Sequence, residues 1–193
     1  MRRKVPKYLS EEQIEKFFSN IHSNEEDVRI AFLLMYKPML RVSEVVSLRV
    51  RDINLREGFL TVYSGKGGVD RVVPLTTDVL RALEDHIRGK EPGDLVVTHK
   101  GKPMDRYYLD RMAKRIAKRA GLTEDVLGFK MSCHKLRHSG ARMWVKAGIR
   151  LNVLQNMMGH SDLSITSIYL NLFPEDAIGE IRKLEGRLGR EAF

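Results

Sequence analysis

The 193-residue sequence contains a single cysteine, Cys133, and this scarcity excludes one class of small protein. A lone cysteine cannot form an intramolecular disulfide, so the chain is no disulfide-stapled secreted domain and a reducing compartment is expected. Long hydrophobic runs are missing too, because the longest apolar stretch, residues 30–36, is too short to span a bilayer. No apolar segment follows the basic start at residues 1–4, which argues against a secretory signal. We therefore expect a soluble, cytoplasmic protein without a membrane-spanning part.

Internal repeats and low-complexity segments are also absent, and the length suits one domain with a sizeable core. Acidic residues are in the minority, since 25 aspartates and glutamates face 34 lysines and arginines, giving a formal net charge of +9. This excess favours a polyanionic partner, with nucleic acid as the first candidate and an acidic membrane surface as the second. Charge alone also leaves open a basic protein without such a partner.

Hydrophobic periodicity predicts an α+β domain that is mostly helical and has a small antiparallel sheet. Helices are expected near 10–21, 25–36, 78–87, 105–120, 133–147, 150–158, 162–170 and 175–188, with one short helix capped by Ser43. Strands are expected at 59–63 and 71–73, and a further short one at 95–97. The glycine-rich turn at 65–68 makes the first two strands a hairpin and places Lys66 near its tip.

Residues suited to phosphate chemistry occur in four short motifs. Arg41 lies in Leu-Arg-Val-Ser-Glu, His134 and Arg137 in His-Lys-Leu-Arg, His160 in Gly-His-Ser, and Tyr169 in Thr-Ser-Ile-Tyr. Guanidinium groups match phosphate oxygens, imidazoles donate or accept protons, and a phenol can attack phosphorus. Together they are equipped to act on a phosphodiester without a metal.

These motifs resemble those of the tyrosine recombinases, also called phage-type integrases. Residues 134–137 match the family's H-x-x-R box, residues 158–161 its L-G-H segment, and residues 166–169 the tail that carries its nucleophile. The resemblance extends upstream through residues 40–44 and 65–68, and so covers nearly the whole chain. It implies the catalytic domain of a site-specific DNA recombinase.

The resemblance also implies a role for each matching residue. Tyr169 would attack a backbone phosphate, giving a 3′-phosphotyrosyl link and a free 5′ hydroxyl. Arg41, Arg137 and His160 would neutralise charge on the non-bridging oxygens, and His134 would assist proton handling at the nucleophile. Because the covalent link conserves the bond energy, no ATP, metal or other cofactor is implied.

Two further positions gain a role only through the resemblance. Lys66 alone would be interpreted as a solvated turn lysine, but the family's hairpin lysine protonates the leaving 5′ oxygen. Arg41 and Glu44 alone would be interpreted as a surface ion pair, but the matching acid of the family supports the site. The family usually has glycine where this chain has Met39, and its tyrosine is often followed by Thr-His rather than by residues 170–171, Leu-Asn.

A metal site is an alternative interpretation of His134 and His138, which lie four residues apart beside Cys133. We reject it because the two histidines lack a third ligand at suitable spacing, and Cys133 is rotated away from them on the helix. His138 is instead expected to be a buried, supporting residue bonded to backbone.

The helix expected at 105–120 is the strongest candidate for contact with double-stranded DNA. Leu109, Met112, Ala113, Ile116 and Ala120 mark its buried stripe. The remaining surface carries five basic residues: Arg111, Lys114, Arg115, Lys118 and Arg119. Such a face can be merely solvated, but the net charge and the phosphate chemistry favour backbone or groove contact.

Members of the family usually carry a DNA-clamping domain before the catalytic one, and here only residues 1–9, a basic, linker-like start, precede the first helix. We expect residues 1–193 to form one catalytic domain, in a fragment or a minimal natural form. The helix at 174–193 is expected to dock on a neighbouring protomer, so that a free monomer assembles on DNA, as a tetramer in the synaptic complex. The alternatives are a type IB topoisomerase-like enzyme and a DNA-binding module without activity.

Overall fold

The computed structural model describes residues 7–63 and 70–159. Lys66, His160 and Tyr169 lie outside these residues, as do the helices expected at 162–170 and 175–188. None of the described helices is long and apolar enough to cross a membrane.

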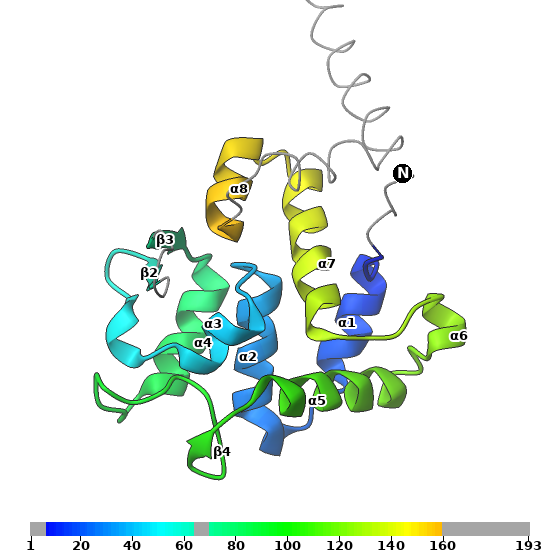
Figure 1. Cartoon of the computed structure of the whole chain (residues 1–193), viewed down its shortest axis with the longest axis horizontal. Coiled ribbons are helices and arrows are strands. Elements are labelled where there is room, and N and C mark those ends of the chain that lie inside the picture. The colour runs from blue at the N-terminus through cyan, green and yellow to red at the C-terminus, as the bar shows by residue number, and fades with distance from the viewer. Residues whose placement is uncertain (1–6, 64–69, 160–193) are drawn as a thin grey trace, which may run out of the picture.

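Helices make up most of the described chain (Figure 1). They are α1 (Glu11–Ser19), α2 (Glu26–Tyr36), α3 (Val42–Ser47), α4 (Thr77–Ile87), α5 (Arg106–Arg119), α6 (Glu124–Leu127), α7 (Cys133–Lys146) and α8 (Leu151–Met158). Two short 3-10 helices, η1 (Ser23–Glu25) and η2 (Val50–Asp52), precede α2 and the first strand. The fold is therefore α+β and mostly helical, as the periodicity predicts.

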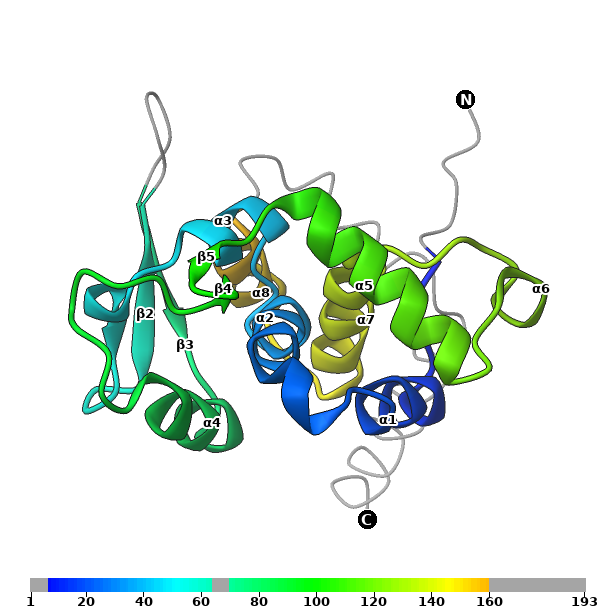
Figure 2. The ribbon, with the colours of Figure 1, turned by 90° about the horizontal axis from the view of Figure 1, so that it is seen from below.

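The strands form two antiparallel sheets. β1 (Ile53–Asn54), β2 (Phe59–Val62) and β3 (Arg71–Pro74) form a three-stranded sheet in sequence order, and β4 (Thr98–His99) pairs with β5 (Lys102–Pro103). Figure 2 shows the larger sheet and α4 at one side of the molecule, α1, α5 and α7 at the other, and α2 between them. The expected hairpin is confirmed, with Val62 paired to Arg71.

Helix α2 is the centre of the core. Seven of its eleven residues are buried, and they lie on all sides of the helix, as expected for an element that is enclosed by others. It packs against α7, α3 and α4. The segment that follows α2 carries Arg41. Because α2 is anchored in the core, the backbone position of Arg41 is set by the core.

Two expectations about local structure are wrong. Ser43 does not cap α3; Arg41 is the N-cap, with extended backbone, and the Glu44 carboxylate accepts a hydrogen bond from the Arg41 backbone N–H at 2.7 Å. Residues 95–97 form no strand, and Leu95 makes only an isolated antiparallel bridge with Arg49. The Val96 carbonyl accepts a hydrogen bond from the Lys90 ammonium rather than from a neighbouring strand, so the pairing does not continue beyond this bridge.

Helices α2 and α7 approach so closely that only glycine fits at position 140. A Cβ atom there would lie 1.8 Å from the Tyr36 carbonyl oxygen and 2.8 Å from its carbonyl carbon. Both are backbone atoms at the end of α2, so they cannot rotate away as a side chain would. This contact holds the middle of α7 against the end of α2.

Replacing Gly140 by alanine is therefore expected to destabilise the protein by at least about 3 kcal/mol, because the two helices must separate. Urea unfolding followed by circular dichroism measures the change. Gly93→Ala is the matched control, because nothing lies within 4 Å of the added Cβ, and it should stay within about 0.5 kcal/mol of wild type. Equal stability of the two variants would contradict this account of the helix contact.

Candidate active site

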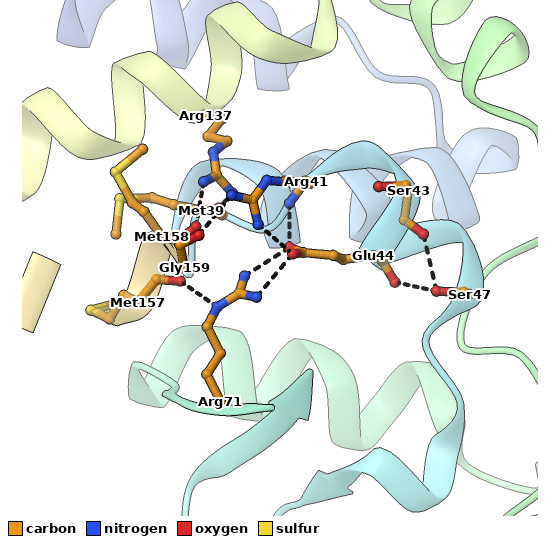
Figure 3. A network of polar contacts seen from close by, with 10 residues as sticks. All are labelled: Met39, Arg41, Ser43, Glu44, Ser47, Arg71, Arg137, Met157, Met158 and Gly159. Atoms are coloured by element: carbon orange, nitrogen blue, oxygen red, sulfur yellow. Dashed lines mark hydrogen bonds and ion pairs between the residues drawn. The ribbon is translucent and has the colours of Figure 1, made fainter. Parts of the chain in front are cut away.

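Three segments far apart in the sequence meet at the C-terminal end of α8 (Figure 3). They are the start of α3 with Arg41 and Glu44, the first residue of β3, Arg71, and the middle of α7 with Arg137. Helix α8 packs against both β3 and α7, which brings its last carbonyl groups to these side chains. Figure 3 shows the three guanidinium groups grouped around Glu44 and the end of α8.

The Glu44 carboxylate accepts hydrogen bonds from two arginine side chains. Arg41 donates from one nitrogen at 2.9 Å, and Arg71 donates from both terminal nitrogens at 2.9 and 2.8 Å. Burial by itself would raise the pKa of Glu44, but the hydrogen bonds from Arg71 and Arg41 and the charge of Arg71 outweigh it and lower the pKa. The carboxylate is therefore ionised at neutral pH and bridges α3 to β3.

The three arginines also donate to three consecutive carbonyl groups at the end of α8. Arg71 bonds the carbonyl of residue 157 at 3.1 Å, Arg137 that of residue 158 at 2.6 Å, and Arg41 that of residue 159 at 2.8 Å. The last carbonyls of a helix lack partners within it and carry partial negative charge. Cations are therefore stabilised here, and the helix end in turn fixes where each guanidinium lies.

Arg137 is held on its other side by Met39. The Met39 carbonyl accepts a hydrogen bond from the Arg137 guanidinium. Arg137 is buried, with only 6% of its surface exposed. Met39 has a φ of 56°, in the left-handed region that favours glycine, and is fully buried. The resemblance leads us to expect glycine here, and the backbone shows why: the chain must turn through this conformation to aim the carbonyl at Arg137.

Exposure separates the arginines. The Arg41 side chain is 42% exposed, whereas that of Arg71 is 10% exposed. His134 is exposed at the start of α7, three residues before Arg137 and hence on the same face of the helix. Arg41 and His134 are thus open to a ligand, whereas Arg71 is enclosed by the network.

The residues expected from the motifs are brought together in part. Arg41, Glu44 and Arg137 share one polar network, and His134 lies one helical turn from Arg137. His138 is half-buried rather than buried as expected, and it has an interaction partner; its supporting role stays a prediction. Since Lys66, His160 and Tyr169 lie outside the described residues, their placement and all the catalytic roles stay predictions.

Arg71 belongs to this network and was missed by the motif analysis. The period-two pattern of its strand contains a signal, because Arg71 lies on the same face of β3 as the buried Val73. A charged residue on the core face of a strand needs a buried partner, and Glu44 is that partner.

Cys133 is buried at the first turn of α7, beside Asp110. Burial, followed by the hydrogen bond and charge of Asp110, raises the pKa of its thiol well above the usual range. Without a bound metal the thiol therefore stays protonated at neutral pH. Asp110 also accepts a hydrogen bond from the Cys133 backbone N–H at 2.8 Å, at the first turn of α7.

Helix α5 has the expected buried stripe and a basic outer face. The stripe includes Ala117, whereas Ala120, which was expected in it, is half-buried. Four basic residues are exposed on the outer face: Arg111, Lys114, Arg115 and Lys118. Arg119 differs from these four, because it is half-buried and forms an ion pair with Glu25, with one N···O distance of 3.0 Å. This pair ties the end of α5 to the 3-10 helix η1.

The left-handed backbone of Met39 predicts an unusual order of stability. Met39→Ala and Met39→Gly both lose the buried side chain, at a cost of about 2–5 kcal/mol, but glycine relieves the backbone strain and should be about 1 kcal/mol the more stable. Met35 in α2, which is also fully buried, is the control, where alanine should be the more stable. Urea unfolding of the four variants tests this, and the same order at both positions would contradict it.

The lowered pKa of Glu44 makes its contribution to stability depend on pH. A carboxyl whose pKa is lower in the folded than in the unfolded protein stabilises above its ordinary value of 4.5, and this stabilisation is lost as pH falls through the folded pKa. Glu44→Gln should therefore melt below wild type at pH 7, with a difference that shrinks as the pH falls below 4.5 and through the folded pKa. Glu84→Gln, at an exposed position, should match wild type throughout. A pH-independent deficit in Glu44→Gln would exclude the carboxylate charge as its cause.

The chain as a whole is similar to proteins of known family. The chain is 31% identical to the tyrosine recombinase XerA of Pyrococcus furiosus over 97% of its own length and 66% of the relative's. It matches the crystal structure of XerA recombinase with a TM-score of 0.78 and 24% identity, over 96% of this chain and 66% of that one. It matches the XerH site-specific recombinase, solved in a post-cleavage complex with its palindromic difH substrate, with a TM-score of 0.73 and 26% identity, over 93% and 53% of the two chains.

The chain spans just under two thirds of the length of the curated relatives that it matches. The family model described as the phage integrase family matches residues 7–176, and thus most of the chain. This chain belongs to the phage integrase family.

Proposed function

We propose that this chain is the catalytic domain of a site-specific DNA recombinase, which cleaves and rejoins DNA through a 3′-phosphotyrosyl intermediate. The observation that carries the proposal is the pair Arg41 and Arg137 on consecutive carbonyls of the α8 end, with Glu44 bonded to Arg41. Fixed guanidinium groups of this kind suit a phosphate whose negative charge increases in the transition state. The recombinase names of the relatives favour strand exchange over the topoisomerase-like alternative.

In the proposed reaction the Tyr169 phenol oxygen attacks the phosphorus and the bond to the 5′ oxygen breaks. The phenol loses its proton with the assistance of His134, and Lys66 gives a proton to the leaving 5′ oxygen. Arg41, Arg137 and His160 neutralise the non-bridging oxygens. Rejoining is the reverse attack by a 5′ hydroxyl, so the phosphodiester energy is conserved and neither ATP nor a metal is needed.

Double-stranded DNA is the proposed substrate. The exposed basic residues of α5 would contact its phosphates: Arg111, Lys114, Arg115 and Lys118. The solved XerH complex with its DNA substrate supports this assignment.

We further propose that the chain is monomeric when free and assembles on paired DNA sites as a tetramer through residues 174–193. We also propose a cytoplasmic location, because the single cysteine of the sequence cannot form an intramolecular disulfide.

Covalent trapping tests the proposed reaction. The 193-residue chain is incubated with a pool of DNA duplexes that have randomised arms and a nick in one strand. Cleavage near the nick releases a short fragment, which diffuses away, so the DNA cannot be rejoined and the covalent adduct remains. Wild type should give an adduct that survives denaturing electrophoresis, and Tyr169→Phe should give none, with non-covalent DNA affinity within about threefold, since only the attacking hydroxyl is removed. Sequencing the attached DNA end then identifies the recognised site.

The matched control is Tyr8→Phe, which removes a tyrosine hydroxyl but keeps the ring that stacks on Arg142. Its adduct yield should equal that of wild type. An adduct that persists in Tyr169→Phe would show that another residue attacks, and the absence of any adduct with wild type across the pool would contradict the proposed reaction.

A further inference from the structure

All three nitrogens of the Arg71 guanidinium are hydrogen-bonded. Its ε nitrogen donates to the carbonyl of residue 157 and its two terminal nitrogens donate to the two oxygens of Glu44. With its side chain 10% exposed, the guanidinium faces the interior of the network rather than a ligand. Arg71 is therefore built to hold other groups in place.

The groups that Arg71 holds are the two anchors of Arg41. One anchor is the Glu44 carboxylate, at 2.9 Å from Arg41, and the other is the carbonyl of Gly159, at 2.8 Å. Arg71 bonds the first anchor directly and bonds the same turn of α8 as the second. One half-buried side chain of β3 therefore contacts the structures that supply both constraints on the Arg41 guanidinium.

Gly159 shows how closely Arg71 is enclosed. A Cβ atom at this position would lie 2.9 Å from the central carbon of the Arg71 guanidinium, and the φ of 61° already favours glycine. The helix end therefore lies directly against the flat guanidinium group. Arg71 is confined by α8 on one side and by the carboxylate of Glu44 on another.

We propose that Arg71 is a positioning residue, which fixes the Arg41 guanidinium for phosphate contact by clamping Glu44 to the C-terminal end of α8. The proposal rests on the proposed recombinase function for its catalytic consequence. The clamp itself is a property of the folded chain without DNA. Lysine cannot replace it, because an ammonium group does not form the planar double contact with a carboxylate.

The catalytic consequence is tested with Arg71→Lys. This variant keeps the positive charge but removes the planar guanidinium that bonds both oxygens of Glu44. The single-turnover rate of adduct formation should fall by about 10²-fold, the scale expected for a misplaced catalytic group, while affinity for uncleaved DNA stays within about threefold. Val79→Ala in α4 is the control for stability alone, because it creates a cavity in the core outside the network, and below its melting temperature its rate should match wild type. Equal fractional losses of rate and affinity in Arg71→Lys would overturn the catalytic part.

The clamp is tested without any reaction by nuclear magnetic resonance on chain carrying ¹⁵N-labelled arginine. The Arg41 side-chain signal is identified by its absence in Arg41→Lys. Hydrogen exchange at that group should be about tenfold faster in Arg71→Lys than in wild type and unchanged in Val79→Ala, because the bonds to Glu44 and Gly159 open more often. Unchanged exchange of Arg41 in Arg71→Lys would overturn the proposal.

These two measurements separate the two proposals. Faster Arg41 exchange in a protein whose wild type forms no covalent adduct would support the clamp and contradict the recombinase function. Normal adduct formation by wild type and by Arg71→Lys, with unchanged exchange, would leave the recombinase function in place and refute the clamp.

Discussion

The half-buried carboxylate of Glu44 is the group on which the rest of the site depends. Removing a charge from water is costly unless it is paired and hydrogen-bonded, and Glu44 meets this requirement with three side-chain hydrogen bonds and one backbone hydrogen bond. The same backbone bond closes the first turn of α3. The Glu44 side chain thus helps to set where α3 begins, how the Arg41 side chain is oriented, and where β3 lies relative to α3.

The end of α8 complements this carboxylate as a second, uncharged acceptor. Three guanidinium groups placed together would repel one another, and a single carboxylate offsets only one of their charges. The three terminal carbonyls of α8 add partial negative charge, and each takes one arginine. The site therefore keeps a net positive charge while each arginine has a fixed direction, as phosphate recognition requires.

Local spacing in the sequence predicts much of the fold, but not the contacts between the motifs. Helices and the hairpin follow from periodicity because their hydrogen bonds are local. The pairing of Arg71 with Glu44 joins residues 27 positions apart, and that of Arg41 with Gly159 joins residues 118 apart, so neither follows from spacing. The expected cap at Ser43 was wrong for a local reason, because the Glu44 carboxylate accepts a hydrogen bond from the Arg41 backbone N–H and so makes Arg41 the N-cap. Family resemblance, rather than periodicity, identified Arg41 and Arg137, and it also drew attention to Met39, whose backbone conformation only the structure reveals.

The long separation between the arginines and their acceptors has a consequence for folding during synthesis. Arg41 and Glu44 leave the ribosome more than a hundred residues before the carbonyls of 157–159 that complete the network. Until α8 docks, α3 and β3 present a cationic surface with only one carboxylate to neutralise it. Contacts of such high sequence separation form late, because loop-closure entropy must be overcome first. The arginine network is therefore among the last parts of the described chain to reach its final shape, after the helical core around α2 is in place.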